Sequence, residues 1–160
     1  MSHEDLVLFG RVGLAFLLCY ALGFERAIRG AAAGDRTFSL VGTAAAAMTA
    51  VTLDHAPQAI GGVVTGVGFI GAGLVLRAGA GMIRGVTSAA AIFAATGIGV
   101  VAGTGHAWLA VFVALLTLLD LELRHLPVLN RLEAHRYSDR MADDPADDDR
   151  NEAPGDGPFG

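Results

Sequence analysis

Residues 61–85 read GGVVTGVGFIGAGLVLRAGAGMIRG, a stretch that combines many glycines with bulky apolar residues. Nine of its 25 residues are glycine, and most of the others are apolar. A flexible linker is also rich in glycine, but its remaining residues are polar. In a membrane, small residues let two helix backbones approach closely, which replaces the hydrophobic driving force available in water. The stretch therefore predicts a tightly packed helix in a membrane bundle.

The composition of the whole chain agrees with a membrane protein. Of its 160 residues, 53% are hydrophobic and only 17% are charged, whereas about a quarter of the residues in a soluble domain are charged. The acidic charge is concentrated at the C-terminal end, because eight acidic residues and two arginines follow from Asp139 onward. We therefore expect a membrane domain over residues 1–126, a short amphipathic segment over 127–141 and an acidic disordered tail over 142–160.

Apolar segments long enough to cross a bilayer recur along the chain. A crossing helix needs about 17 to 25 mostly apolar residues. Candidates are Leu6–Phe24, Thr37–Leu53, Gln58–Leu76, Val86–Gly103 and Ala107–Leu123. The predicted fold class is an all-α integral membrane protein with five transmembrane helices.

The positions of the arginines predict the orientation of these helices. Arginines lie in the first and third connections and after the fifth segment, while the second and fourth connections have none. Cytoplasmic loops carry the excess of basic residues. Five crossings place every arginine-bearing connection on one side, with the N-terminus outside and the C-terminus in the cytoplasm.

Helical spacing arranges the glycines of the third segment in stripes. At 100° per residue, Gly61, Thr65, Gly68 and Ala72 form one stripe of small side chains, and a second lies about 100° around the helix. Such stripes are typical of helices that pack closely against neighbours. The predicted packing glycines are Gly61, Gly62, Gly66, Gly68, Gly71 and Gly73.

Enzymatic readings of the sequence are not supported. Residues 66–71, GVGFIG, match a dinucleotide pattern, but that pattern requires a preceding strand and an acidic residue about 20 positions on. No acidic residue occurs between Asp54 and Asp120. A hydrolase would need a nucleophile beside a histidine, yet Ser88 is predicted at the inner face and the nearest histidines at the outer face. We expect neither catalysis nor nucleic-acid binding.

The glycine-rich stretch and its surroundings resemble the MgtC/SapB family of bacterial inner-membrane proteins. The resemblance rests on GVGFIGAGLVLR, on IRGVTSAAAIFAATGIGVVAG, and on the earlier groups Gly23-Phe24-Glu25-Arg26, Gly34-Asp35-Arg36-Thr37 and Leu40-Val41-Gly42. It implies a five-helix domain with its N-terminus outside and an association with magnesium homeostasis. Phe93 stands where members often have tryptophan, and many members carry a soluble C-terminal domain where mostly polar residues follow the fifth segment here.

Charged residues gather at the predicted inner face. The family motifs single out Glu25, Arg26, Asp35, Arg36, Arg84 and Thr87 as candidate functional residues. One interpretation is a ring of ion pairs and arginines that anchors the helix ends. Another is a Mg²⁺ site formed by Glu25 and Asp120, because Mg²⁺ needs only one or two carboxylates besides water. A third is recognition of phospholipid headgroups or an acidic partner by the arginines.

Arg11 is separate from this group, since it lies about one turn inside the first helix from the outer side. We expect it to extend outward or to pair with Asp54.

The favoured function is that of a non-enzymatic accessory or regulator of other membrane proteins in magnesium homeostasis. The alternative is a transporter or channel for a divalent cation such as Mg²⁺. A single copy offers no acidic residue in the middle of the membrane, so a pore would form at the seams of a homo-oligomer. A small enzyme acting on lipid or peptide is a third reading. The expected partners are the bilayer and another membrane protein.

Overall fold

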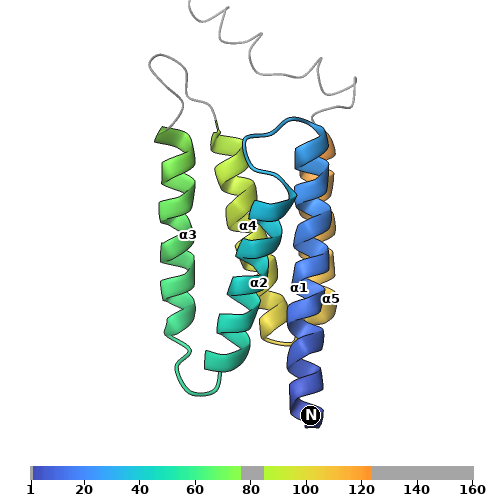
Figure 1. Cartoon of the computed structure of the whole chain (residues 1–160), viewed down its shortest axis with the longest axis vertical. Helices are drawn as coiled ribbons and strands as arrows, with labels where there is room; N and C mark the ends of the chain where they lie inside the picture. Colours follow the sequence, from blue (N-terminus) through green and yellow to red (C-terminus); the bar gives the residue numbers. More distant parts are fainter. Residues whose placement is uncertain (1, 77–84, 124–160) are drawn as a thin grey trace, which may run out of the picture. The chain divides into compact units, whose positions relative to one another are not determined.

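A computed structural model of the chain describes residues 2–76 and 85–123, and within these ranges the regular structure is entirely helical. The helices run in alternating directions (Figure 1). Their bounds are α1 His3–Ile28, α2 Asp35–Thr52, α3 Ala59–Leu76, α4 Val86–Gly103 and α5 Ala107–Leu123. The predicted all-helical architecture is thereby confirmed. The expected amphipathic segment 127–141 and tail 142–160 lie outside the described residues.

Local signals set the ends of the helices. Ser2 and Asp5 form a capping box, so α1 begins three residues before its apolar run. At its other end α1 continues to Ile28 and stops at Gly30, which has φ +66. Gly105, with φ +91, follows α4 in the same way. Glycine adopts this left-handed conformation without the penalty that a Cβ would bring.

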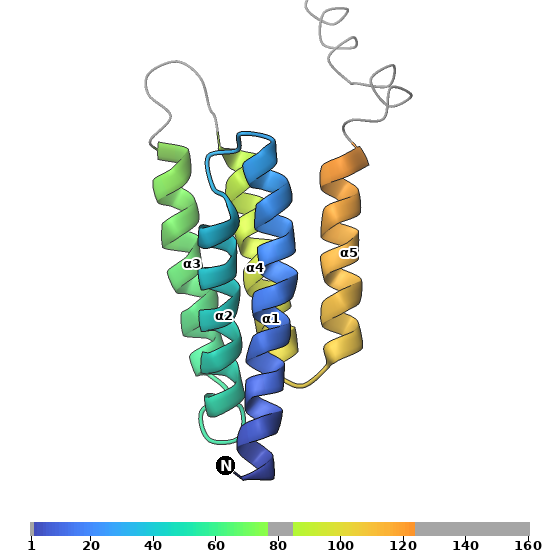
Figure 2. The same cartoon turned by 45° about the vertical axis from the view of Figure 1, so that its right-hand side comes forward.

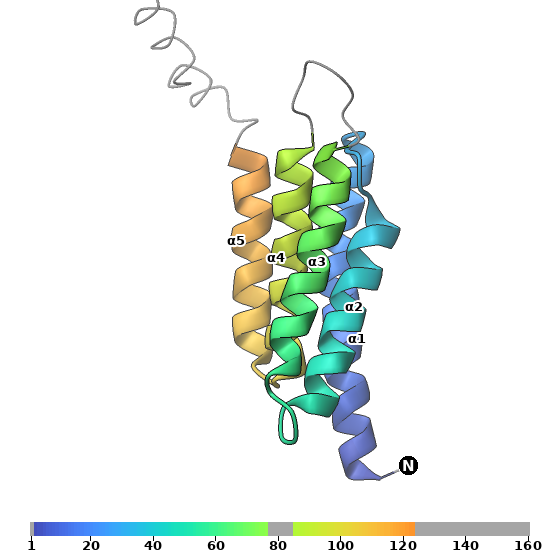
Figure 3. The same cartoon turned by 90° about the vertical axis from the view of Figure 1, so that its left-hand side faces the viewer.

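The second helix is the central one. α2 packs against α1, α3 and α4, and α1 also packs against α4. In Figure 2 α1, α2 and α4 form a close group, while α5 stands to one side. Figure 1 shows α3 at the opposite edge of the bundle, and in Figure 3 α3 lies in front, between α4 and α2. The many alanines of α2 suit this position, because small side chains allow three neighbouring helices to pack closely against it.

Within residues 2–76 and 85–123, two helices are long and apolar enough on their own to cross a membrane. These are α1 and α4, and the apolar run Ala59–Val75 of α3 is slightly shorter. α2 begins with Asp35 and Arg36, and α5 has 17 residues with Asp120 near its end. Large apolar side chains on the outer surface, such as Phe69 at 82% exposure and Trp108 at 87%, suit a lipid environment.

Most glycines of α3 have no close neighbour among the described residues. A Cβ added at Gly61, Gly62, Gly66, Gly68 or Gly73 would meet no described atom within 4 Å, and at Gly71 it would touch only Ala89 in ordinary contact. The grip by two neighbours that the stripes predict is therefore not found in this part of the chain, and the packing role of these glycines stays a prediction. The glycine stripes face outward, and α3 contacts α4 and α2 through its other side.

Glycine-dependent contacts occur instead around α2. A Cβ at Gly99 would collide with the carbonyl oxygen of Gly42, and one at Gly103 would lie 2.6 Å from that of Ala46. Real Cβ contacts are essentially never closer than 3.0 Å. Gly42 itself faces Cys19, whose Sγ is the nearest atom to a Cβ built there. The backbones of α2 and α4 thus touch directly, with α1 filling the space left by Gly42.

Cys19 marks the point where three helices meet. It lies on α1, is fully buried, and donates from Sγ to the carbonyl oxygen of Ala95 on α4 at 3.4 Å. Leu22, Phe38 and Ile98 are also fully buried in this core. The apolar interior therefore lies among α1, α2 and α4.

Replacing Gly99 by alanine is expected to destabilise the bundle by at least about 1–3 kcal/mol, the usual cost of overpacking. The same change at Gly66 is expected to leave stability unchanged or raise it, because the position is open and alanine favours helix by about 1 kcal/mol. Reversible unfolding in mixed micelles measures both. Equal effects of Gly99→Ala and Gly66→Ala would contradict the assignment of the contacts.

Candidate functional site

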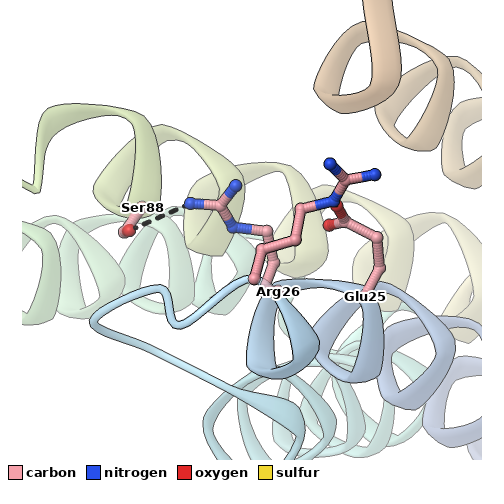
Figure 4. A network of polar contacts seen from close by, with 4 residues as sticks. Glu25, Arg26 and Ser88 are labelled. Atoms are coloured by element: carbon pink, nitrogen blue, oxygen red, sulfur yellow. Dashed lines mark hydrogen bonds and ion pairs between the residues drawn. The ribbon is translucent and has the colours of Figure 1, made fainter. Parts of the chain in front are cut away.

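A cluster of charged and polar side chains lies where α1 ends and α4 begins. Glu25 and Arg26 belong to the last turns of α1, and Ser88 belongs to the first turn of α4. Figure 4 shows the Arg26 side chain reaching from α1 toward Ser88, with Glu25 beside it. This end of the bundle corresponds to the predicted arginine-rich side.

Glu25 is a largely buried carboxylate. It forms an ion pair with Arg29, one turn further along α1, and the two side chains are 13% and 28% exposed respectively. Both carboxylate oxygens are shielded from solvent, and neither accepts a hydrogen bond from a described residue. A shielded charge of this kind depends on its ionic partner, because removal of that partner leaves it uncompensated.

Arg26 crosses to the other helix. Its Nη2 donates to the Oγ of Ser88 at 3.4 Å, a long hydrogen bond, and its Nε is buried with no hydrogen-bond partner among the described residues. Ser88 is only 4% exposed. The guanidinium therefore links α1 to α4, and its Nε–H can still donate to a further acceptor.

α4 begins without a side-chain cap. Its N-cap is Gly85, with φ +91, and a Cβ there would lie 3.3 Å from the carbonyl oxygen of Leu74 at the end of α3. Thr87, on the first turn, is exposed, whereas Ser88 points into the bundle. Of these two family-motif neighbours, only Ser88 belongs to the cluster.

The start of α2 is held against α1 through Gly23. A Cβ on Gly23 would lie 2.6 Å from the Cα of Asp35 and 2.9 Å from the Cβ of Phe38. The Asp35 carboxylate accepts a hydrogen bond from the backbone N–H of Arg36 at 2.9 Å, and the Arg36 side chain is exposed. In the described residues neither side chain bonds to the cluster, so their functional roles stay predictions.

The Mg²⁺ ligand pair stays a prediction as well. Asp120 is exposed near the end of α5, and Arg84 lies outside the described residues. Across residues 2–76 and 85–123, no group of three or more His, Cys, Asp or Glu side chains is placed to hold a metal ion.

Arg11 anchors the opposite end of the bundle. Its Nη1 donates to the carbonyl oxygen of Gly103 at 3.3 Å, and its guanidinium lies close to Gly105. A cation at a helix C-terminus is favoured by the helix dipole. The expected pairing with Asp54 is wrong, because the free carbonyls at the end of α4 provide the partner.

A model of the MgtC family matches residues 12–128, which include both helices of the cluster. The chain belongs to the MgtC family. It is 41% identical over 128 residues to the Escherichia coli (strain K12) protein named "Putative magnesium transporter YhiD", covering 72% of this chain and 59% of that protein. No solved structure matches the chain.

Two further relatives extend this comparison. A Haemophilus influenzae protein named only as uncharacterized is 30% identical over 153 residues, covering 87% of this chain and 63% of that protein. "Protein MgtC" of Salmonella typhimurium is 38% identical over 96 residues, covering 58% of this chain and 41% of that protein. This MgtC-family chain therefore spans less than two thirds of the length of each relative.

Sequence reasoning did not find Ser88 as the partner of Arg26. A serine in an apolar helix most often bonds within its own helix, and nothing in the spacing showed that α1 and α4 are neighbours. The signal that could have found it is the pair of family motifs, because Arg26 and Ser88 belong to two of them.

Replacing Ser88 by alanine is expected to lower the stability of this MgtC-family protein by about 1 kcal/mol, since a hydrogen bond to a partly buried cation is lost. Thr87→Ala is the matched control, and its exposed side chain predicts no measurable change. Unfolding in mixed micelles distinguishes them. A larger effect at Thr87 than at Ser88 would show that the cluster has been assigned to the wrong face of α4.

Proposed function

We propose that this chain is a non-enzymatic, multi-pass protein of the bacterial inner membrane that acts in magnesium homeostasis as an accessory or regulator of other membrane proteins. Family membership and the magnesium-related name of one relative support the context. Because the chain spans only part of its relatives, its activity and partners are inferred from its own residues.

The arrangement of the helices supports five crossings with the N-terminus outside. Alternating directions bring the C-terminal ends of α1 and α3 together with the N-terminal ends of α2 and α4 (Figure 1). Arg26, Arg29 and Arg36 lie at these ends, which suits a cytoplasmic face. α2 packs against three helices on one side and presents Leu40, Met48 and Val51 on the other, at 70%, 55% and 67% exposure, which gives it an apolar surface for lipid.

The closed interior of the helix bundle supports an accessory role over transport. The group formed by α1, α2 and α4 is filled by apolar side chains and by direct backbone contacts at Gly42, Gly99 and Gly103. Thr96, buried in the same region, donates its hydroxyl to the Ile92 carbonyl of its own helix. In the described residues the centre therefore offers no line of oxygen ligands for a strongly hydrated cation.

Transport is the alternative, favoured by the outward-facing glycines of α3. A second copy packed on this face would form a homo-oligomeric seam, and an ion path there would not need the closed interior. Glu25 with Asp120 would then be the carboxylates that attract Mg²⁺.

Catalysis is not supported by the placement of reactive groups. Ser88 lies in the first turn of α4, and His106 follows the last turn of the same helix. An 18-residue helix is about 27 Å long, so these side chains lie too far apart to act together.

Proteoliposomes containing the purified protein are expected to take up Mg²⁺ no faster than empty liposomes, because the interior of a single copy is closed. A fluorescent Mg²⁺ indicator inside the vesicles makes the measurement, with a known Mg²⁺ channel as the positive control. Uptake by the wild type that disappears in a folded Glu25→Gln variant would overturn the accessory role and establish transport.

A further inference from the structure

The charge of Arg26 has no counterion among the described residues. Glu25, the adjacent carboxylate, forms its ion pair with Arg29. In residues 2–76 and 85–123 the Arg26 side chain makes one hydrogen bond, that to Ser88 at 3.4 Å, and its shielded Nε has no acceptor there. A shielded donor on a charged group costs free energy unless an acceptor reaches it.

The guanidinium also faces a helix end of the same sign. The first N–H groups of α4, on Val86, Thr87 and Ser88, have no acceptor within the helix, and the N-cap Gly85 supplies no side-chain cap. The N-terminus of a helix carries a partial positive charge, which repels a cation and attracts an anion. Arg26 is favoured by the negative end of its own helix, but its side chain extends across to Ser88 at the start of α4 (Figure 4).

We infer that Arg26, Ser88 and the first turn of α4 bind a phosphate group. A guanidinium fork, a hydroxyl and the backbone N–H groups of a first helical turn can each donate to a different oxygen of one phosphate. A cation is disfavoured there, because Arg26 and the helix end both repel it. This inference rests on the proposed function, since it names the ligand of the same cluster through which the protein would be regulated.

The phosphate can come from a phospholipid headgroup or from a free phosphate in the cytoplasm. Exposed apolar residues lie beside the cluster, with Phe24 at 51%, Ile28 at 71% and Val86 at 54% exposure. Acyl chains can contact such residues while the headgroup reaches Arg26. A free phosphate would use the same donors without these apolar contacts.

The test measures binding of two probes to the full chain purified in dodecyl maltoside. Phosphatidylglycerol binding is followed by native mass spectrometry, and inorganic phosphate binding by broadening of its ³¹P resonance. Saturable binding of at least one probe is expected, and Arg26→Gln should weaken it at least about tenfold, as expected for loss of a charge-assisted hydrogen bond. Binding of the lipid alone assigns the headgroup, and binding of inorganic phosphate alone assigns a free phosphate.

Arg11→Gln is the control, because it removes the same charge at the opposite end of the bundle, where Arg11 donates to the carbonyl oxygen of Gly103. Its binding should stay within about twofold of the wild type, since roughly 22 Å of helix separates it from Arg26 and salt screens charges beyond about 10 Å. Ser88→Ala should weaken binding less than Arg26→Gln, and it carries the test if Arg26→Gln does not fold. No saturable binding of either probe, or equal losses from Arg26→Gln and Arg11→Gln, would overturn the inference. The Mg²⁺ uptake result does not depend on either outcome, so the two proposals can fail separately.

Discussion

The contact between Cys19 and Gly42 is the constraint on which the rest of the bundle depends. Gly42 has no side chain, so the thiol of α1 occupies the space that a Cβ on α2 would need. The same thiol donates to the carbonyl oxygen of Ala95 on α4. On the other side, the backbone of Gly42 touches Gly99. One residue without a side chain therefore brings three helices together, and in lipid such close packing replaces the hydrophobic effect as the source of stability.

This close packing also brings Glu25, Arg26 and Ser88 together in the candidate cluster, and it leaves α3 partly uncovered. Because α1 and α4 lie side by side, Arg26 at the end of one can reach Ser88 at the start of the other. Gly85 allows α4 to begin close to the end of α3. The N-terminus of α4, which receives no side-chain cap from Gly85, then lies beside Arg26. α3 remains at the edge with its glycines facing outward. The interior is closed. Among the described residues, the buried unsatisfied atoms of Glu25 and Arg26 lie at its end, and the buried hydroxyl of Thr49 lies on α2 beside Gly103.

The sequence was sufficient to predict the helices and insufficient to predict their neighbours. Apolar length and turn residues located Val86–Gly103 and Ala107–Leu123 with the bounds that the structure has. The many glycines of α3 did not indicate which helices pack together. A stripe of small residues shows that another helix can approach closely, but it does not show which helix does so. The single glycine of α2, Gly42, matters more for packing, because it faces two neighbouring helices at once. The link between Arg26 and Ser88, 62 residues apart, depended on the same unknown neighbours.

A double-mutant cycle between positions 19 and 42 tests this account most directly. Gly42→Ala alone should destabilise the bundle, because its Cβ collides with the Cys19 side chain. Cys19→Gly alone should also destabilise it, through a cavity and the low helix propensity of glycine. In the double variant the collision is absent. The free energies of unfolding in mixed micelles should therefore show a favourable coupling energy of at least about 1 kcal/mol between the two positions. Independent sites deviate from additivity by only about 0.3–0.5 kcal/mol. Additive effects of the two substitutions would show that Cys19 and Gly42 are not in contact and would contradict the packing described here.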